Sequence, residues 1–191
     1  MRRFKKWLLL LAVIVSTVTV TVSIWAGQST VKSEITIRRV EPQTVLYTIY
    51  RGDYKGIGKT ISNLFALSGQ KKIWPSGTPY FTYLNNPEHV PSKHWLTEIR
   101  IPVEEEALKL AGTLGEMVDV KKLPAMTVAV AIKPPGLADS KSVYVRLDKW
   151  IYTQGYIADE DPCEKFLSNV KTGDYAQMKS EILVPIRKVT K

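Results

Sequence analysis

A seven-residue motif that occurs twice constrains the fold of this chain more than any other feature. Residues 97–103 read TEIRIPV, and residues 180–186 read SEILVPI, 83 positions later. Three further pairs of landmarks recur at an offset of 82 or 83 positions: Pro42 with Pro124, Pro79 with Pro162, and Tyr83 with Phe166. Landmarks that stay in register indicate an internal duplication. The sequence therefore predicts two similar units packed about a pseudo-twofold axis, with a cleft where they meet.

The N-terminus predicts a membrane anchor. Residues 1–6 include four Arg or Lys side chains, and residues 7–26 contain no charge, which is about the length that crosses a hydrocarbon core. Trp7 and Trp25 stand at the two ends, where amphipathic rings favour the interface. The basic cluster predicts a cytoplasmic N-terminus and an extracytoplasmic domain. A cleavable signal peptide is the alternative, although Ile24-Trp25-Ala26 makes a poor cleavage site; both interpretations export the domain.

Composition argues against several classes of function. The chain carries 27 basic and 18 acidic residues, and four of the basic ones precede the anchor, so the exported part has a net charge of 23 − 18 = +5. No basic run is interleaved with aromatic residues, which argues against nucleic-acid binding. The single cysteine, Cys163, excludes an internal disulfide. His89 and His94 lie in a loop without neighbouring cysteines, so we expect no metal site and no cofactor.

Hydrophobic periodicity predicts the order β-α-β-β in each unit. The expected strands and helix of the first unit cover residues 45–50, 57–65, 80–84 and 95–103, and those of the second cover 126–132, 143–151, 163–167 and 179–186. A helix over residues 104–114, acidic at its start, is expected to connect the units. The sequence thus predicts an α+β domain over residues 39–188, with repeats at about 40–103 and 122–187. It follows the stub 1–6, the transmembrane helix 7–26 and a linker at 27–38.

These landmarks resemble the GyrI-like effector-binding domain, which is also the ligand-binding half of some multidrug-responsive transcription regulators. The resemblance rests on Pro42, on YRGDY at residues 50–54, on PCEKF at residues 162–166 and on both Glu-Ile-x-x-Pro motifs, and it covers about residues 38–188. It implies a cleft between the repeats that binds small, often cationic and aromatic molecules, with a glutamate on the last strand as the charged anchor. Some relatives hydrolyse strained electrophiles. The predicted anchor, in place of a DNA-binding domain, argues against a direct transcriptional role.

Strand alternation selects the glutamate expected at the site. Ile182 and Val184 share the face that should pack against the helices, which leaves Glu181 facing the cleft. Glu98, its counterpart, has Arg100 two residues along the same face as a neutralising partner. A carboxylate between low-dielectric walls attracts a cation strongly; the alternative for Glu181 is an ordinary strand glutamate with a basic partner. The other predicted ligand-binding residues are Tyr50, Phe166, Glu164, Tyr83 and Trp95, whose aromatic members offer cation–π contacts.

Three functions fit this pattern. The first is an exported, membrane-anchored module that senses or sequesters an amphipathic, cationic aromatic ligand. The second is a hydrolase that uses Glu181 as general base with a tyrosine assisting. The third is a structural domain with a closed cleft that holds a partner protein. The sequence favours the first, because it offers a cleft and aromatic walls but no independent catalytic constellation.

Overall fold

The computed structural model describes residues 34–135, 140–167 and 178–189. The predicted anchor at residues 7–26 lies outside these ranges. None of the helices in the described residues has the length and hydrophobicity needed to cross a bilayer.

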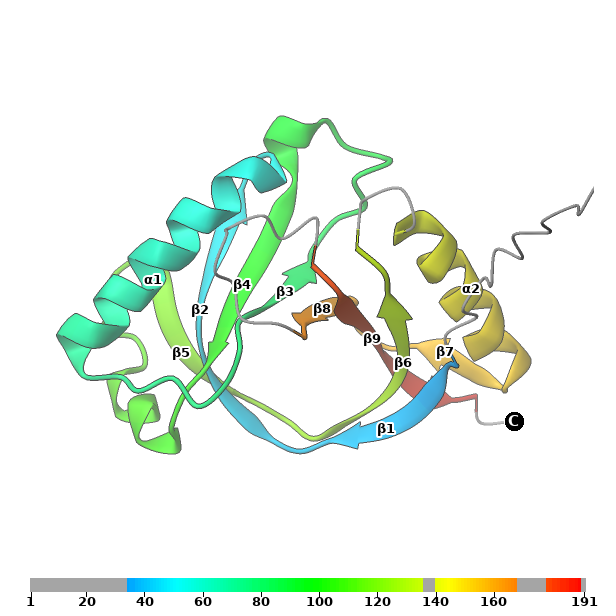
Figure 1. Cartoon of the computed structure of the whole chain (residues 1–191). Coiled ribbons are helices and arrows are strands. Elements are labelled where there is room, and N and C mark those ends of the chain that lie inside the picture. Colours follow the sequence, from blue (N-terminus) through cyan, green and yellow to red (C-terminus); the bar gives the residue numbers. More distant parts are fainter. Residues whose placement is uncertain (1–33, 136–139, 168–177, 190–191) are drawn as a thin grey trace, which may run out of the picture. The chain divides into compact units, whose positions relative to one another are not determined.

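The described residues form one curled antiparallel sheet and two α-helices (Figure 1). The strands are β1 (Thr36–Val40), β2 (Gln43–Arg51), β3 (Tyr80–Tyr83), β4 (Leu96–Pro102), β5 (Val118–Leu123), β6 (Met126–Lys133), β7 (Tyr156–Ala158), β8 (Cys163–Phe166) and β9 (Ser180–Lys188). The helices are α1 (Ile57–Lys71) and α2 (Ser140–Thr153), with 3₁₀ turns η1 (Tyr54–Gly56), η2 (Ser92–His94) and η3 (Glu105–Leu110). The strand order is β1-β6-β9-β8-β3-β4-β2-β5, and β7 pairs with β9.

The strand order confirms the two predicted β-α-β-β units. β2-α1-β3-β4 forms the first unit, and β6-α2-β8-β9 forms the second, with β7 added after α2. Counted from its middle, the sheet reads β3-β4-β2-β5 in one direction and β8-β9-β6-β1 in the other. The last strands of the units, β4 and β9, are separated by β3 and β8.

The two units meet at the pairing of β3 with β8. Phe81 lies directly opposite Glu164 in this ladder, and 164 − 81 = 83 is the repeat offset of the sequence. Positions related by the duplication are thus cross-strand neighbours at the centre of the sheet. One of these two positions carries a phenyl ring and the other a carboxylate. The two units therefore place chemically different side chains at equivalent positions of the sheet.

The two units exchange a strand. β1 leads into β2 but pairs with β6 of the second unit, while β5 leads into β6 but pairs with β2 of the first. Sequence periodicity missed both strands. β1 was expected to be part of a linker, because its TIRRV sequence lacks an apolar alternation. In the structure this strand is almost entirely exposed. The segment before β5 was expected to be an α-helix, but it forms the shorter 3₁₀ turn η3.

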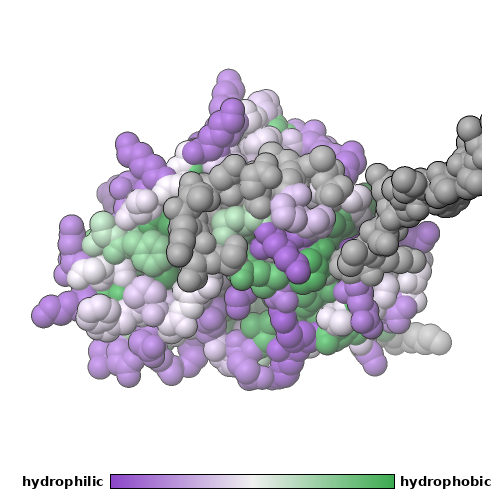
Figure 2. Space-filling model, in the orientation of Figure 1, coloured by the Kyte–Doolittle hydropathy of each residue, from purple (hydrophilic) through white to green (hydrophobic). Residues whose placement is uncertain are grey.

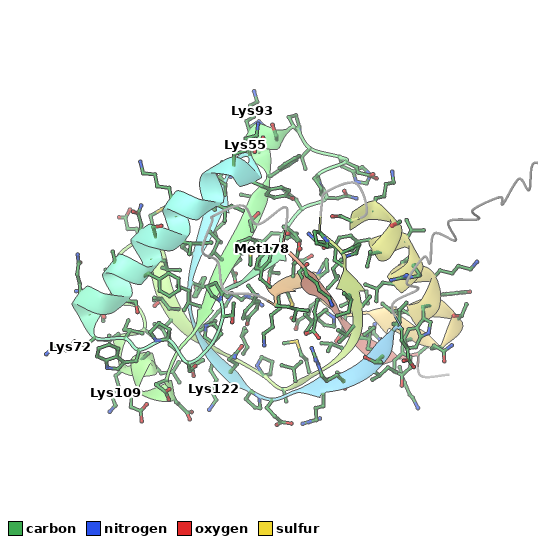
Figure 3. The ribbon with its side chains drawn as sticks, viewed as in Figure 1. Lys55, Lys72, Lys93, Lys109, Lys122 and Met178 are labelled. Atoms are coloured by element: carbon green, nitrogen blue, oxygen red, sulfur yellow. The ribbon has the colours of Figure 1, made fainter. Side chains whose placement is uncertain are left out.

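Hydrophobic cores cover both faces of the sheet. On one face, α1 packs on side chains that include Leu46, Phe81 and Ile99, and α2 packs on a separate cluster that includes Ala131 and Ile182. The opposite face buries its own apolar cluster: Val45, Tyr80, Val128, Val130, Cys163 and Leu183. Figure 3 shows Met178, which joins the α1 core, in the middle of the domain, whereas Lys72, Lys109 and Lys122 project from its periphery.

Gly56 fixes the start of α1 by letting a tyrosine pass close to the backbone. The Tyr50 hydroxyl donates to the Asp53 carbonyl oxygen at 2.8 Å. A Cβ atom at Gly56 would lie 2.0 Å from that hydroxyl oxygen, whereas one at Gly58 would meet nothing within 4 Å. Only glycine therefore fits at position 56, and the contact sets the position of residues 53–57.

This contact predicts opposite effects for alanine at two neighbouring glycines. Gly58→Ala should stabilise the protein by about 1 kcal/mol, because alanine is the better helix former. Gly56→Ala should destabilise it by about 2 kcal/mol, because the new methyl group overlaps the Tyr50 ring. Urea unfolding followed by circular dichroism measures both free energies. Equal stability of the two variants would show that the Tyr50 ring moves aside without cost.

Candidate ligand-binding site

A large cavity opens on the helix-bearing face of the sheet, between α1 and α2. Its volume is about 1300 Å³, which exceeds that of most sites for drug-sized ligands. Its walls come from residues 53–57 at the start of α1, from one face of α2, from β3 and β8, and from the loops at residues 85–88 and 158–162. Figure 2 shows hydrophobic residues gathered in the middle of this face, between the two helices.

Aromatic rings form one wall of the cavity. Tyr54 stacks on Trp95 with ring centroids 4.5 Å apart, and it also contacts Tyr83 at 5.6 Å. Phe81 and Phe166 meet edge to face at 4.9 Å. Burial raises the pKa of the Tyr54 phenol to about 12, with smaller contributions from nearby carboxylates. The wall therefore offers neutral, polarisable faces that suit a flat apolar or cationic group.

A buried polar group, which we call the Glu164 cluster, lies at the floor of the cavity. It consists of Glu164, Lys133, Tyr83 and Ser180. The Tyr83 hydroxyl donates to Glu164 Oε2 at 2.6 Å, the Ser180 hydroxyl donates to Oε1 at 2.6 Å, and Lys133 Nζ forms an ion pair with Oε1. Glu164 is 4% exposed and Lys133 is 2% exposed. Burial and the charge of Glu164 raise the pKa of Tyr83 well above its usual range, so Tyr83 acts as a hydrogen-bond donor.

Carboxylates outnumber ammonium groups around the cavity. The acidic lining residues are Asp53, Glu88, Asp148, Glu160, Asp161 and Glu164, and the basic ones are Lys55, Lys133 and Lys141. Over the described residues the lining charge is 3 − 6 = −3, in contrast with the positive net charge of the whole chain. Lys141 pairs with Glu88 at 2.6 Å, whereas Glu160 and Asp161 form no ion pair within the described residues. The mouth of the cavity is therefore a negative region of a basic protein.

Four of the six predicted ligand-binding residues line this cavity: Glu164, Phe166, Tyr83 and Trp95. Tyr50 does not, because its ring packs against the α1 core and Gly56. Glu181 does not either. It lies on the opposite face of the sheet and pairs with Arg38 of β1 at 2.7 Å.

Glu181 was predicted to face the ligand cleft, but the cavity opens on the other face of the sheet. Alternation correctly put Ile182 and Val184 toward the helices, but the cavity opens on that same face. The residues that line it are therefore those whose side chains point with Ile182. Glu164 is one of them, because it lies opposite Ile182 in the β8–β9 ladder. The unpredicted strand β1 then supplies Glu181 with its basic partner.

Sequence reasoning missed Tyr54, Tyr144, Lys133 and Ser180. Tyr54 closes the YRGDY segment and was a visible candidate. Lys133 ends the apolar run of β6, where a charged residue normally marks the exit of a strand into solvent. Only the pairing of Lys133 with Ser180 in the β6–β9 ladder shows that this lysine is buried.

The predicted neutralisation of Glu98 by Arg100 is confirmed on the opposite face. Arg100 Nε donates to Glu98 Oε1 at 2.5 Å, and Lys121 Nζ lies 2.7 Å from the same oxygen. Burial alone would raise the pKa of Glu98, but hydrogen bonds from Lys121 and Arg100 hold it below its usual range. Glu98 is therefore a carboxylate with two cationic partners and does not line the cavity.

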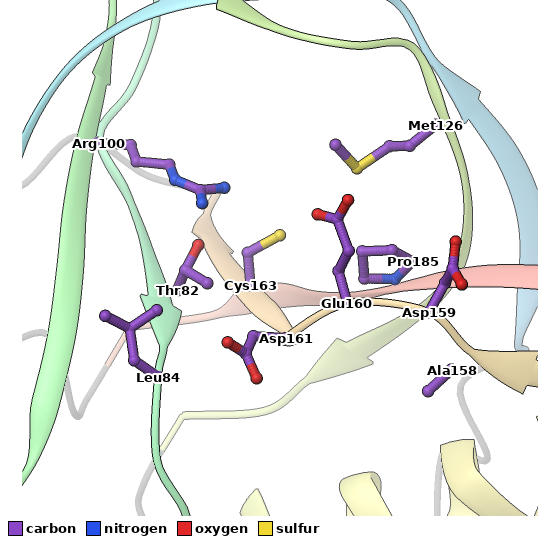
Figure 4. Close-up of a pocket in the computed structure, with 10 residues that line it drawn as sticks. All are labelled: Thr82, Leu84, Arg100, Met126, Ala158, Asp159, Glu160, Asp161, Cys163 and Pro185. Carbon is purple, nitrogen blue, oxygen red and sulfur yellow. The ribbon is translucent and has the colours of Figure 1, made fainter. Parts of the chain in front are cut away.

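A smaller cavity of about 500 Å³ lies on this opposite face. Figure 4 shows the polar ends of Arg100, Cys163 and Glu160 directed toward the same space. Burial raises the pKa of the Cys163 thiol to about 11, so the thiol is protonated at neutral pH. Within the described ranges, no group of three or more His, Cys, Asp or Glu side chains is placed to hold a metal ion.

Comparison with solved structures shows which fold this is. The C-terminal domain of EcmrR matches with a TM-score of 0.67 and 18% identity, over 83% of this chain and 99% of that chain. A cryo-EM structure of an EcmrR–DNA complex matches with a TM-score of 0.67 and 17% identity over 82% of this chain. This chain spans 58% of that EcmrR chain.

Two other structural neighbours are a hydrolase and a protein bound to an aromatic cation. A hydrolase from Listeria innocua has a TM-score of 0.60 and 13% identity, over 82% of this chain and 93% of that one. SAV2435 bound to tetraphenylphosphonium has a TM-score of 0.50 and 10% identity, over 81% of this chain and 94% of that one. At these identities the likeness establishes the fold alone.

The sequence itself gives the family. No curated protein matches it. The GyrI-like small molecule binding domain matches residues 33–187, which is 187 − 33 + 1 = 155 of the 191 residues. This match, the duplicated β-α-β-β sheet and the aromatic cavity between its helices together show that the chain belongs to the GyrI-like small molecule binding domain family.

Proposed function

We propose that this domain binds small amphipathic molecules with an aromatic or other flat apolar part, in the cavity between α1 and α2. The observation that carries the proposal is an open cavity of about 1300 Å³ walled by aromatic rings. The side chains of the described residues leave this space unfilled, which argues against a purely structural domain with a closed cleft. The tetraphenylphosphonium of SAV2435 is a ligand of this kind and makes a suitable first probe.

The ligand charge that fits best is positive or zero. The described lining residues have a net charge of −3, and the faces of Tyr54 and Trp95 attract cations. An anion would meet the exposed carboxylates of Asp148 and Asp161, which line the cavity. We therefore expect cationic and neutral aromatics to bind and anionic ones to bind weakly.

The role of Trp95 tests the aromatic wall. Trp95→Ala should weaken binding of tetraphenylphosphonium about ten-fold or more, because it removes the ring that stacks on Tyr54. Trp74 is 67% exposed and does not line the cavity, so Trp74→Ala is the matched control and should leave affinity unchanged. Isothermal titration calorimetry measures both. Equal affinities in the two variants would place the ligand elsewhere.

We also propose, from residues 7–26, that the domain is exported and held at the membrane, where it senses or sequesters its ligand. The protein should then stay in the membrane fraction after a carbonate wash, and a C-terminal tag should be cleaved by protease added outside the cell. Recovery of a soluble form that begins near residue 27 would support the signal-peptide alternative.

A hydrolase of strained electrophiles is the second candidate, and the Tyr83–Glu164 hydrogen bond favours it. The Tyr83 phenol, held at 2.6 Å from Glu164, would protonate the leaving oxygen of a strained ring, while the carboxylate takes a proton from the water that attacks the ring carbon. The base would be Glu164 and not Glu181. Incubation with an epoxide, followed by mass spectrometry, should show addition of one water by the wild type and loss of this reaction in Tyr83→Phe. No turnover by the wild type would leave binding as the function.

A further inference from the structure

We propose that Lys133 is a specificity-determining residue, which occupies the cation position beside Glu164 and so makes the floor of the cavity electrically neutral. The inference rests on the proposed binding function and narrows its ligand class. The deep end of the native cavity takes uncharged groups, and any positive charge on the ligand stays at the mouth.

Both oxygens of Glu164 already have partners within the protein. Oε1 accepts from Ser180 and pairs with Lys133, while Oε2 accepts from Tyr83. The side chains of Lys133 and Glu164 are only 3% and 5% exposed. A ligand cation that took the place of the Lys133 ammonium would leave this lysine buried without a counter-ion. Leaving a buried charge unpaired is strongly unfavourable.

The duplication supports the view that the two charges belong together. The repeat offset of 83 residues relates Glu164 to Phe81, Lys133 to Tyr50 and Ser180 to Thr97. Lys133 pairs with Ser180 in the β6–β9 ladder, and Tyr50 pairs with Thr97 in the β2–β4 ladder. The first unit thus places three uncharged side chains where the second places an ion pair and its hydroxyl donor. The unit that places a carboxylate at this buried position, Glu164, also places a lysine, Lys133, beside it.

The mouth of the cavity offers a different environment. Asp148 and Asp161 line this cavity, are exposed and form no ion pair within the described residues. A positive group there keeps part of its hydration and displaces no protein cation. The cavity therefore orients an amphipathic ligand with its uncharged end at Glu164 and its charged end outward.

The experiment measures ligand selectivity by calorimetry. Tetraphenylphosphonium, triphenylphosphine oxide and tetraphenylborate serve as cationic, neutral and anionic probes of related shape. They are titrated into the wild type, Lys133→Met, Glu164→Gln and the double variant. Two controls remove the same charges elsewhere: Lys122→Met outside the cavity, where the side chain is 51% exposed and pairs with Glu105, and Glu181→Gln on the opposite face.

The expected result is a change of selectivity that follows the floor charge. The wild type should bind the cation and the neutral probe within a few-fold of each other. Lys133→Met should raise the cation-to-neutral affinity ratio about ten-fold or more, because it exposes an unpaired carboxylate to the ligand. Glu164→Gln should shift the preference toward the anion. The double variant, with both charges removed, should return to the wild-type ratio, and the two controls should stay within about two-fold of it.

The outcomes separate the inference from the function on which it rests. Binding of the probes with the same cation-to-neutral ratio in wild type and Lys133→Met would overturn the role of Lys133 and leave the binding function standing. No binding of any probe to the wild type would overturn the function itself. If circular dichroism shows that Lys133→Met does not fold, the selectivities of Glu164→Gln and of the double variant test the inference instead. An unchanged preference in both then overturns the inference.

Discussion

The pairing of β3 with β8 is the interaction on which the rest of this structure depends. It joins the two units in one sheet, and its register sets Phe81 opposite Glu164 where the units meet. Each neighbouring strand follows from that ladder by antiparallel pairing outward. α1 and α2 lie on the same face of the sheet and are separated by the β3–β8 pair. The space between the helices therefore has β3 and β8 as its floor. The cavity is thus a direct product of joining two β-α-β-β units edge to edge.

Successive side chains along β3 and β8 point to opposite faces of the sheet, so neighbouring residues lie in two different environments. Thr82 and Cys163 point to the face that buries Arg100 and Tyr80, while Phe81 and Glu164 point to the cavity. Both faces hold a buried glutamate with basic partners, Glu98 on one and Glu164 on the other. The difference lies in access. Glu98 sits beside Arg100 and Lys121 outside the ligand cavity, whereas Glu164 forms its floor.

The sequence predicted the architecture better than the chemistry of the site. The duplicated motif at residues 97–103 and 180–186 led to the right units, because a repeat carries its pattern of strands with it. β1 and β5 could not be found in the same way, since their pairing partners belong to the other unit and their own patterns are polar. Glu181 was preferred over Glu164 for a related reason. Alternation tells which residues share a face, but only the packing of α1 and α2 tells which face opens to a ligand.

The burial of Lys133 shows a further limit of a sequence pattern. A lysine at the end of an apolar run reads as a residue that leaves the core. Its burial depends on Ser180 beside it and on Glu164 across the next strand, which lie 47 and 31 residues further along the chain. A partner at that distance is set by the fold, and no local pattern carries the information.

The exchange of β1 and β5 also determines the order in which the domain can form. Thr36 pairs with Val130, 94 residues later in the chain, so the first strand has no partner until the second unit exists. Contacts between such distant segments slow folding, because the entropy of closing the intervening loop is lost before the ladder forms. During synthesis, the first unit must wait with an open edge at β2 until β5 emerges, and β1 must wait longer still for β6. The N-terminal strand is therefore the first to be made, but it has no partner until β6 follows.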